Sequence, residues 1–138
     1  MKSITSLLIL FALLNPTEPP KLTIKISNIQ SMKGEIKVGI FSTEAAFLKE
    51  GKALKNYSIK AEKTSLSFTV ADLPKGEYAI SMYHDENSDQ KMNTNFIGIP
   101  KEPYGFSNNV KPKMSAPKFK ECKFNFQENT TLNIKLIR

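Results

Sequence analysis

Apolar and polar residues alternate along most of this chain. In residues 22–26, Leu22, Ile24 and Ile26 are separated by Thr23 and Lys25. A period of two places the apolar side chains on one face of an extended strand. The same period recurs further along, so we predict seven strands, at residues 22–26, 36–40, 57–61, 66–70, 78–82, 119–126 and 131–137.

The spacing of these segments predicts the fold class. Turn signals such as SMKGE (31–35) and DLPKGEY (72–78) recur between short strands, which is typical of a β-sandwich. Strands that alternate in this way have one wet face, which suits antiparallel sheets. We therefore expect an all-β, seven-stranded antiparallel Ig-like sandwich. The segment STEAAFLKEG (42–51) favours a helix, with Ser42 or Thr43 as its cap and Gly51 at its end.

The first twenty residues have a different pattern. Lys2 precedes an apolar run from Ile4 to Leu14, and a proline-rich polar stretch follows. This order is typical of a secretory signal, and the run is too short for a stable transmembrane helix. A buried N-terminal strand or helix is the alternative. We expect residues 1–20 to be a signal peptide, residues 21–138 to form one domain, and the protein to be exported to the periplasm or the extracellular space.

The charge and the cysteine content limit the classes of partner and of covalent link that we expect. The formal charge is +7, and Arg138 is the single arginine. Nucleic-acid readers rely on arginine for bidentate contacts, so we expect no nucleic-acid partner. The lysine-rich segment VKPKMSAPKFKECK (110–123) is either a solvated edge or a surface for anionic partners. Cys122 is the single cysteine, so it has no intramolecular disulfide partner, and we expect it to be a small buried hydrophobe.

Residues 85–118 follow neither the strand period nor a helical period. They contain too many aromatic and aliphatic side chains for a disordered tail. Loops of this length are uncommon in compact domains and are often functional. We expect one long ordered loop that folds over one end of the sandwich.

Three stretches carry a resemblance to a known family. They are KGEIKVGIF (33–41), LPKGEYAI (73–80) and HDENSDQKMNTNFIGIPKEPYGFSNN (84–109). Together they resemble the signature of an exported bacterial family, domain of unknown function number 2141, over roughly residues 21–137. The LPKGEYAI stretch is also similar to transthyretin-like and carboxypeptidase-regulatory-like domains. The resemblance implies an exported protein, and the second likeness implies a small Ig-like accessory or binding module.

The start of the long loop spaces its oxygen-bearing side chains as a calcium loop does. On such a loop, Asp85 takes position 1 and the Lys91 carbonyl takes position 7. Hard cations prefer these oxygens, and extracellular modules bind calcium weakly, with dissociation constants of ~10⁻⁴ to 10⁻³ M. The candidate metal ligands are Asp85, Asn87, Asp89 and Asn93.

Two features of a calcium loop are missing. Gln90 replaces the turn glycine and Phe96 replaces the bidentate acid, although Asn95 or Glu102 could supply the missing oxygen. The alternative is an Asx-rich loop whose side chains bond their own backbone. Calcium is therefore one expectation for this loop, and a purely structural turn is the other.

The same region mixes aromatic faces with amides and one histidine. This combination suits a polar ligand with apolar faces, although the aromatics could instead fill the space between loop and sandwich. The candidate ligand-binding residues are His84, Phe96, Tyr104, Phe106, Asn108 and Asn109. The partner would be an unknown polar ligand or a cell-surface protein.

Catalysis is the alternative function. His84 is the single histidine, and it continues the buried face of the preceding strand. We expect its ring to bond loop carbonyls at the rim of the core rather than act as a general base. The leading hypothesis is a non-enzymatic binding module with its site in residues 84–109. The alternative is a hydrolase that uses His84 and the carboxylates of Asp85, Glu86 and Asp89.

Overall fold

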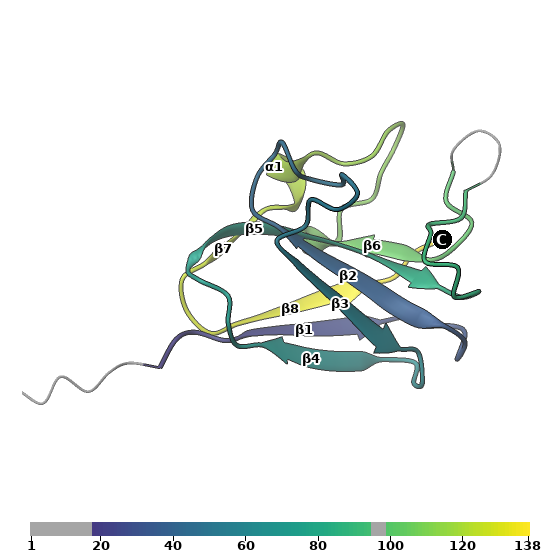
Figure 1. Cartoon of the computed structure of the whole chain (residues 1–138), viewed down its shortest axis with the longest axis horizontal. Coiled ribbons are helices and arrows are strands. Elements are labelled where there is room, and N and C mark those ends of the chain that lie inside the picture. The colour runs from purple at the N-terminus through teal and green to yellow at the C-terminus, as the bar shows by residue number, and fades with distance from the viewer. Residues whose placement is uncertain (1–17, 95–98) are drawn as a thin grey trace, which may run out of the picture.

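Two β-sheets pack face to face in a computed structural model that describes residues 18–94 and 99–138 (Figure 1). The smaller sheet has the order β4-β1-β8, formed by β4 (Leu66–Val70), β1 (Leu22–Ser27) and β8 (Thr130–Lys135). The larger sheet has the order β3-β2-β5-β6, formed by β3 (Lys55–Lys60), β2 (Glu35–Phe41), β5 (Gly76–Asp85) and β6 (Tyr104–Phe106). The short strand β7 (Phe124–Phe126) pairs with the first part of β5.

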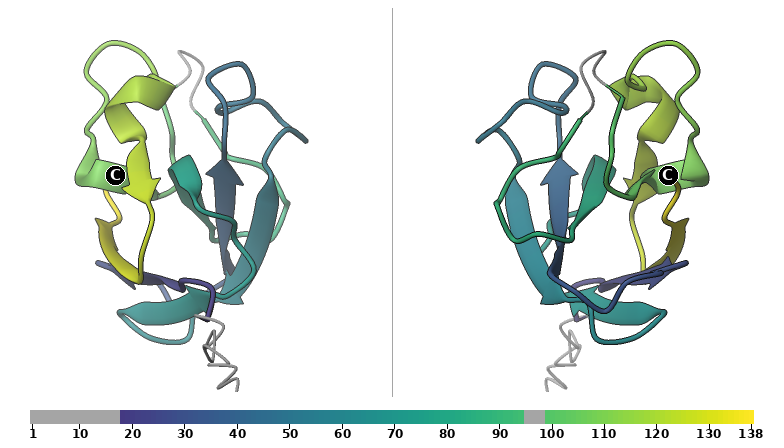
Figure 2. Two further views of the ribbon diagram at one scale, coloured as in Figure 1. Left: turned by 90° about the vertical axis from the view of Figure 1, so that its left-hand side faces the viewer. Right: turned by 90° about the vertical axis from the view of Figure 1, so that its right-hand side faces the viewer.

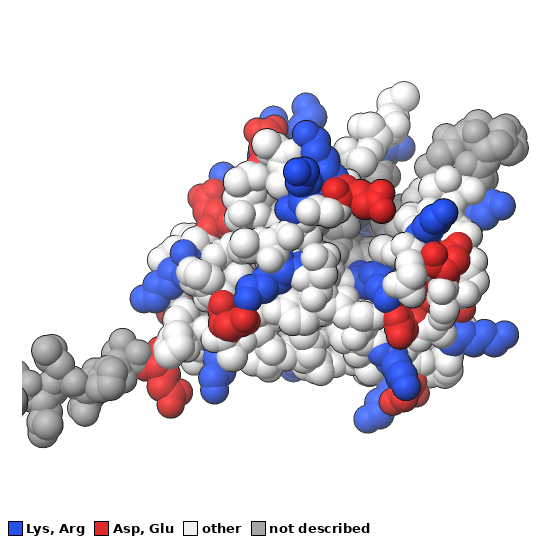
Figure 3. All heavy atoms as spheres, viewed as in Figure 1, with Lys and Arg blue, Asp and Glu red and all other residues white. Residues whose placement is uncertain are grey.

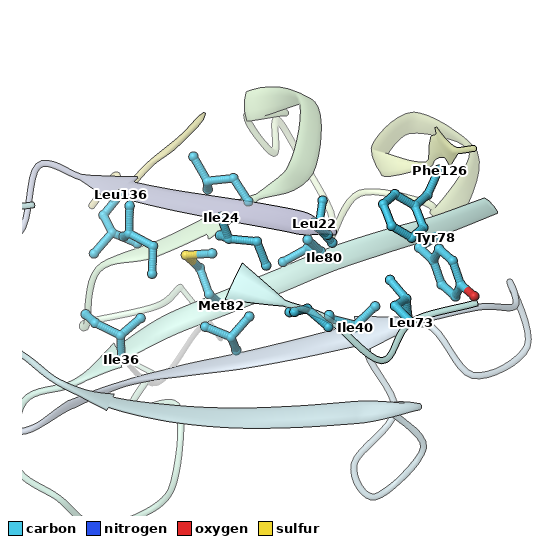
Figure 4. Close-up of a cluster of buried hydrophobic side chains, with 14 of the residues drawn as sticks. Leu22, Ile24, Ile36, Ile40, Leu73, Tyr78, Ile80, Met82, Phe126 and Leu136 are labelled. Carbon is cyan, nitrogen blue, oxygen red and sulfur yellow. The ribbon is translucent and has the colours of Figure 1, made fainter. Parts of the chain in front are cut away.

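The main core lies between the two sheets. The alternating positions of β1, β2 and β5 point into it, as Figure 4 shows for Ile24, Ile40 and Met82. Full burial of each such side chain contributes roughly 1.5–3 kcal/mol relative to exposure. The period of two therefore supplies most of the driving force for the sandwich.

A second apolar cluster covers the opposite face of the larger sheet at one end. Phe47, from the connection between β2 and β3, packs edge to face on Phe41 and on Phe119, with ring centroids 5.4 and 5.9 Å apart. Phe119 begins the short helix α1 (Phe119–Cys122), whose Cys122 is fully buried in this cluster. At this end the larger sheet thus has both faces covered.

The described residues contain eight strands, not the seven predicted. The additional strand, β6, lies inside the predicted loop 85–118, and the 3-10 turn η1 (Ser107–Asn109) follows it. The sheets are also not wholly antiparallel, because β1 and β8 pair in parallel, with Ile24 opposite Leu132. The broad prediction of a mostly antiparallel β-sandwich is confirmed.

Two local predictions were wrong. Residues 42–51 form turns instead of a helix, and the positive φ angle of Leu48, 62°, interrupts a right-handed helix before Gly51 is reached. The expected cap contact is nevertheless present, since Thr43 Oγ1 accepts from the Ala46 N–H at 3.2 Å. Residues 119–126 are not one strand but α1 followed by β7.

Two sequence predictions concern the N-terminal segment. Residues 1–17 of the expected signal peptide lie outside the described residues. Among the residues that are described, no helix has the length and apolar character needed to cross a membrane.

Replacing Ile80 with alanine should lower the free energy of unfolding by about 2–5 kcal/mol, because the side chain is fully buried between the sheets. Urea denaturation measures this change. Lys25→Ala, on the exposed face of β1, is the control and should change it by less than about 0.5 kcal/mol. Equal losses from the two variants would show that the buried face is assigned wrongly.

The Cys122 thiol should be unreactive in the folded protein. Burial, assisted by the nearby Glu121 charge, raises its pKa to about 11, so very little thiolate exists at pH 8. A thiol reagent such as DTNB should label the native protein slowly and the urea-unfolded protein at once. Fast labelling of the native state would contradict the burial of this side chain.

Candidate functional site

The end of β5 is fixed by the turn between β1 and β2. Gly34 has a φ angle of 68°, and a Cβ at this position would lie 1.9 Å from the Asp85 carbonyl oxygen. No other residue fits there without moving the backbone of β5. The KG pair at 33–34 therefore determines where the strand ends and the acidic loop begins.

His84 ties this turn to the strand. Its ring is fully buried, and Nε2 donates to the Lys33 carbonyl oxygen at 2.6 Å. Its main-chain N–H donates to the Pro103 carbonyl at 2.8 Å, which brings the far end of the loop back to β5. Among the described residues, His84 Nδ1 has no hydrogen-bond partner. His84 therefore connects three segments: the turn between β1 and β2, the end of β5, and the residues just before β6.

Two buried carboxylates hold the loop that follows. Asp85 Oδ1 accepts from the Asp89 N–H at 3.2 Å, and Oδ2 accepts from the Gln90 N–H at 2.9 Å. Glu102 does the same from the other side of the loop. Its Oε2 accepts from the Glu86 N–H at 2.6 Å and its Oε1 from the Asn93 N–H at 2.9 Å. Each of the four oxygens thus binds one main-chain N–H of the loop.

A third carboxylate completes an acidic cluster. Oxygens of Asp85, Asp89 and Glu102 all lie within 4.8 Å of one another. The pKa of Asp89 is lowered, chiefly by the Lys91 N–H and then by the side chains of Asn93 and Asn87. We call the three acids with Asn87 and Asn93 the acidic cluster. Of the four predicted metal ligands, the structure brings the carboxylates of Asp85 and Asp89 together with that of Glu102, while Asn87 Nδ2 donates to Asp89 Oδ2 at 3.2 Å.

Within the described part of the chain, no lysine or arginine forms an ion pair with Asp85, Asp89 or Glu102. The ion pair nearest in sequence joins Arg138 to Glu86. Two carboxylates about 5 Å apart repel by roughly 3 kcal/mol at an effective dielectric constant of 20. In addition, Asn93 Oδ1 is buried without a donor in this part of the structure. The cluster is therefore an acceptor-rich site that a cation would stabilise.

The predicted ligand-binding residues do not form one site. Phe96 lies outside the described residues. Tyr104 is half-buried on β6, where it packs against Phe106, whose ring belongs to the second apolar cluster. The amides of Asn108 and Asn109 bond main-chain groups near α1 and on β8. Together with the buried His84, these side chains hold the loop to the sandwich.

A groove adjoins the acidic cluster on the outer face of the larger sheet. Its volume is about 730 Å³, within the range of about 300–1,000 Å³ that small-molecule sites occupy. One wall comes from residues 48–53 and the other from residues 90–92, directly after Asp89, and Figure 3 shows the hollow between them. The lining includes Lys37, Gly39, Phe41, Asn56, Ser81, Tyr83, Lys91, Met92 and Phe106.

The sequence did not predict this groove because five segments form it, from residues 37–41, 48–58, 81–83, 90–92 and Phe106. One signal was available in Gly39, which interrupts the strand pattern of KVGIF. Glycine inside a strand often marks a place where something approaches the backbone closely. Gly39 lies at the floor, between Asn56 of β3 and Ser81 of β5 in the register of the sheet.

The family described as "Uncharacterized protein conserved in bacteria (DUF2141)" matches residues 24–134. The chain belongs to this family. No curated protein and no solved structure matches it significantly. The region matched to the DUF2141 family includes the whole acidic cluster and both walls of the groove.

Glu102→Ala should lower the free energy of unfolding by about 1–3 kcal/mol, because it leaves the Glu86 and Asn93 N–H groups without their acceptors. Urea denaturation in EDTA isolates this effect from any bound metal. Hydrogen exchange of the same two amides should accelerate. Glu62→Ala, an exposed acid, is the control. A Glu102 variant as stable as the control would mean that other groups hold the loop.

Proposed function

We propose that this protein is an exported, non-enzymatic binding module whose loop after β5 holds one calcium ion. One observation carries the proposal: two buried carboxylates lie within 4.8 Å of a third, with no lysine or arginine paired to them in the described residues. Buried charge of one sign normally requires a partner. A divalent cation would neutralise the cluster.

The make-up of the cluster favours calcium over magnesium. Calcium binds oxygen ligands at about 2.3–2.6 Å, so two ligands of one ion lie at most about 5 Å apart. Oxygens of the three carboxylates lie within 4.8 Å of one another, which this ion can span. The cluster also combines carboxylates with a buried amide oxygen, Asn93 Oδ1, in an irregular loop. Calcium tolerates such irregular shells, whereas magnesium demands a smaller octahedral one.

The groove supplies the binding function, and the cation would order it. Gln90 and Lys91 line the groove, and their N–H groups bond Asp85 and Asp89. An ion on these carboxylates would therefore fix one wall of the groove. Aromatic rings and hydroxyl or amide groups along the lining suit a polar ligand with apolar faces, either a small molecule or part of a cell-surface protein.

The burial and the hydrogen bond of His84 favour a binding function over hydrolysis. Its ring is buried and already bonded to a main-chain carbonyl, so it is poorly placed to take a proton from a bound substrate. The Ig-like character belongs to the same proposal. It is supported by the two stacked sheets, although the parallel β1–β8 pair departs from a wholly antiparallel sandwich.

Calcium should raise the melting temperature of the purified protein. At ten times the dissociation constant a ligand contributes ~1.4 kcal/mol, which corresponds to roughly 5 °C for a domain of this size. Asp89→Asn should abolish the rise, because the variant removes one carboxylate of the cluster. Differential scanning calorimetry with and without 10 mM calcium chloride, at about ten times a millimolar dissociation constant, measures both.

Asp72→Asn is the matched control for this experiment, since it removes an exposed carboxylate that pairs with Lys55 and lies outside the cluster. It should keep the full response to calcium. The proposal of a calcium site is abandoned if the unmodified protein shows no shift at 10 mM calcium. The loop would then be held by its main-chain hydrogen bonds alone.

A further inference from the structure

A lysine-rich loop projects from the sandwich between η1 and α1. We call residues 110–118 the lysine loop. Together with the start of α1, it encloses a hollow of about 470 Å³ whose lining includes Lys111, Lys113, Lys118 and Lys120. This hollow shares no lining residue with the groove beside the acidic cluster.

The charge of this surface is not compensated locally. Residues 110–123 contain five lysines and one glutamate, so they carry +4 (five minus one) of the chain's formal +7. The carboxylate of Glu121 is engaged by the Lys118 N–H at 2.7 Å, and Lys123 pairs with Glu77 at 3.5 Å. The other four lysines form no ion pair within residues 18–94 and 99–138.

The tip of the loop is apolar. Met114 is 100% exposed, the largest exposed fraction among the big hydrophobic side chains described. Lys113 precedes it, and the small residues Ser115 and Ala116 follow it, all exposed. A single exposed apolar side chain is ordinary on a protein surface. This one stands at the end of a basic loop, which is the arrangement that peripheral proteins use at an anionic membrane boundary.

The loop is presented by a rigid base. Asn108 Nδ2 donates to the Lys123 carbonyl at 2.9 Å, and Asn109 bonds β8 through both ends of its amide. Pro117 is buried and anchors the other end. The base therefore holds the tip away from the sandwich.

The connection between β2 and β3 adds to the same end of the molecule. It packs on α1 through Phe47 and Phe119, and it carries the partly exposed Leu48. Its two lysines, Lys49 and Lys52, are matched by Glu44 and Glu50, so it adds apolar surface but no net charge. Figures 1 and 2 show that this connection and the lysine loop project in the same direction, away from the smaller sheet.

We propose that this end of the protein docks on an anionic lipid bilayer. The four unpaired lysines face the lipid headgroups and Met114 enters the boundary between headgroups and acyl chains. Basic residues near an anionic membrane surface and apolar side chains inserted at its boundary are the two contributions that hold a peripheral protein in place. Arginine, which nucleic-acid recognition would favour, is absent from this surface.

The test is co-sedimentation with vesicles in EDTA, which keeps it independent of the proposed calcium site. The protein should bind vesicles of 30% phosphatidylglycerol in phosphatidylcholine, and binding should weaken at 0.5 M sodium chloride. The variant Lys111→Gln, Lys113→Gln, Lys118→Gln, Lys120→Gln should bind roughly a few hundredfold less tightly, at about fivefold for each lysine. Met114→Ser should weaken binding several-fold without changing the salt dependence.

The matched control removes four exposed lysines from the other side of the molecule, as Lys25→Gln, Lys60→Gln, Lys63→Gln and Lys135→Gln. It has the same net charge as the loop variant and should keep most of the binding. Equal loss in the two variants would assign binding to net charge and overturn the proposal. So would equal binding to pure phosphatidylcholine, or none to phosphatidylglycerol. If Met114→Ser binds vesicles as tightly as the unmodified protein, Met114 does not insert into the bilayer, and that part of the proposal is wrong.

Discussion

The long loop depends on two buried acids at its two ends. Asp85 closes β5 and Glu102 precedes β6, and their four carboxylate oxygens accept four main-chain N–H groups of the residues between them. The described residues of this segment, 86–94 and 99–101, form no extended strand in which to pair their backbone, so the carboxylates replace the sheet as acceptors. The arrangement concentrates negative charge at one point. The same constraint that orders the loop therefore gathers the carboxylates on which the proposed calcium site rests.

The sandwich keeps this loop in place because β6 joins both sheets. Tyr104 pairs with Tyr83 of β5, and its main chain also exchanges hydrogen bonds with Ile137 after β8, at 2.9 and 2.8 Å. Gly105 permits this approach, since a Cβ there would lie 2.9 Å from Ile134 Cγ2. The parallel pairing of β1 with β8 fixes β8 in the smaller sheet, and with it the residues that bond Tyr104. The far end of the loop is thus set by contacts with β5 and with the residues that follow β8.

The sequence predicted what is local and missed what is distant. Period-two alternation located most strands, because the burial of one face acts on neighbouring residues. It failed at residues 119–122, where Phe119 and Cys122 lie one helical turn apart and both face the second apolar cluster. The parallel β1–β8 pair was not predictable, since nothing in either segment specifies its partner. The spacing of Asp85, Asp89 and Asn93 pointed to the acidic cluster because these residues are close in sequence, whereas the groove is built from five separate segments and was not predicted.

Asn108 and Asn109 show why a polar motif is ambiguous without coordinates. Both were predicted to bind a ligand, yet both have positive φ angles, 62° and 50°, which asparagine adopts more readily than most residues. Their amides bond backbone groups near α1 and on β8, and Ser107 bonds the Cys122 carbonyl and the Ile80 N–H. From the sequence alone, an asparagine amide that bonds the backbone of a turn cannot be distinguished from one that binds a ligand. Here the amides fix the base of the lysine loop to α1 and β8, so their observed role is structural.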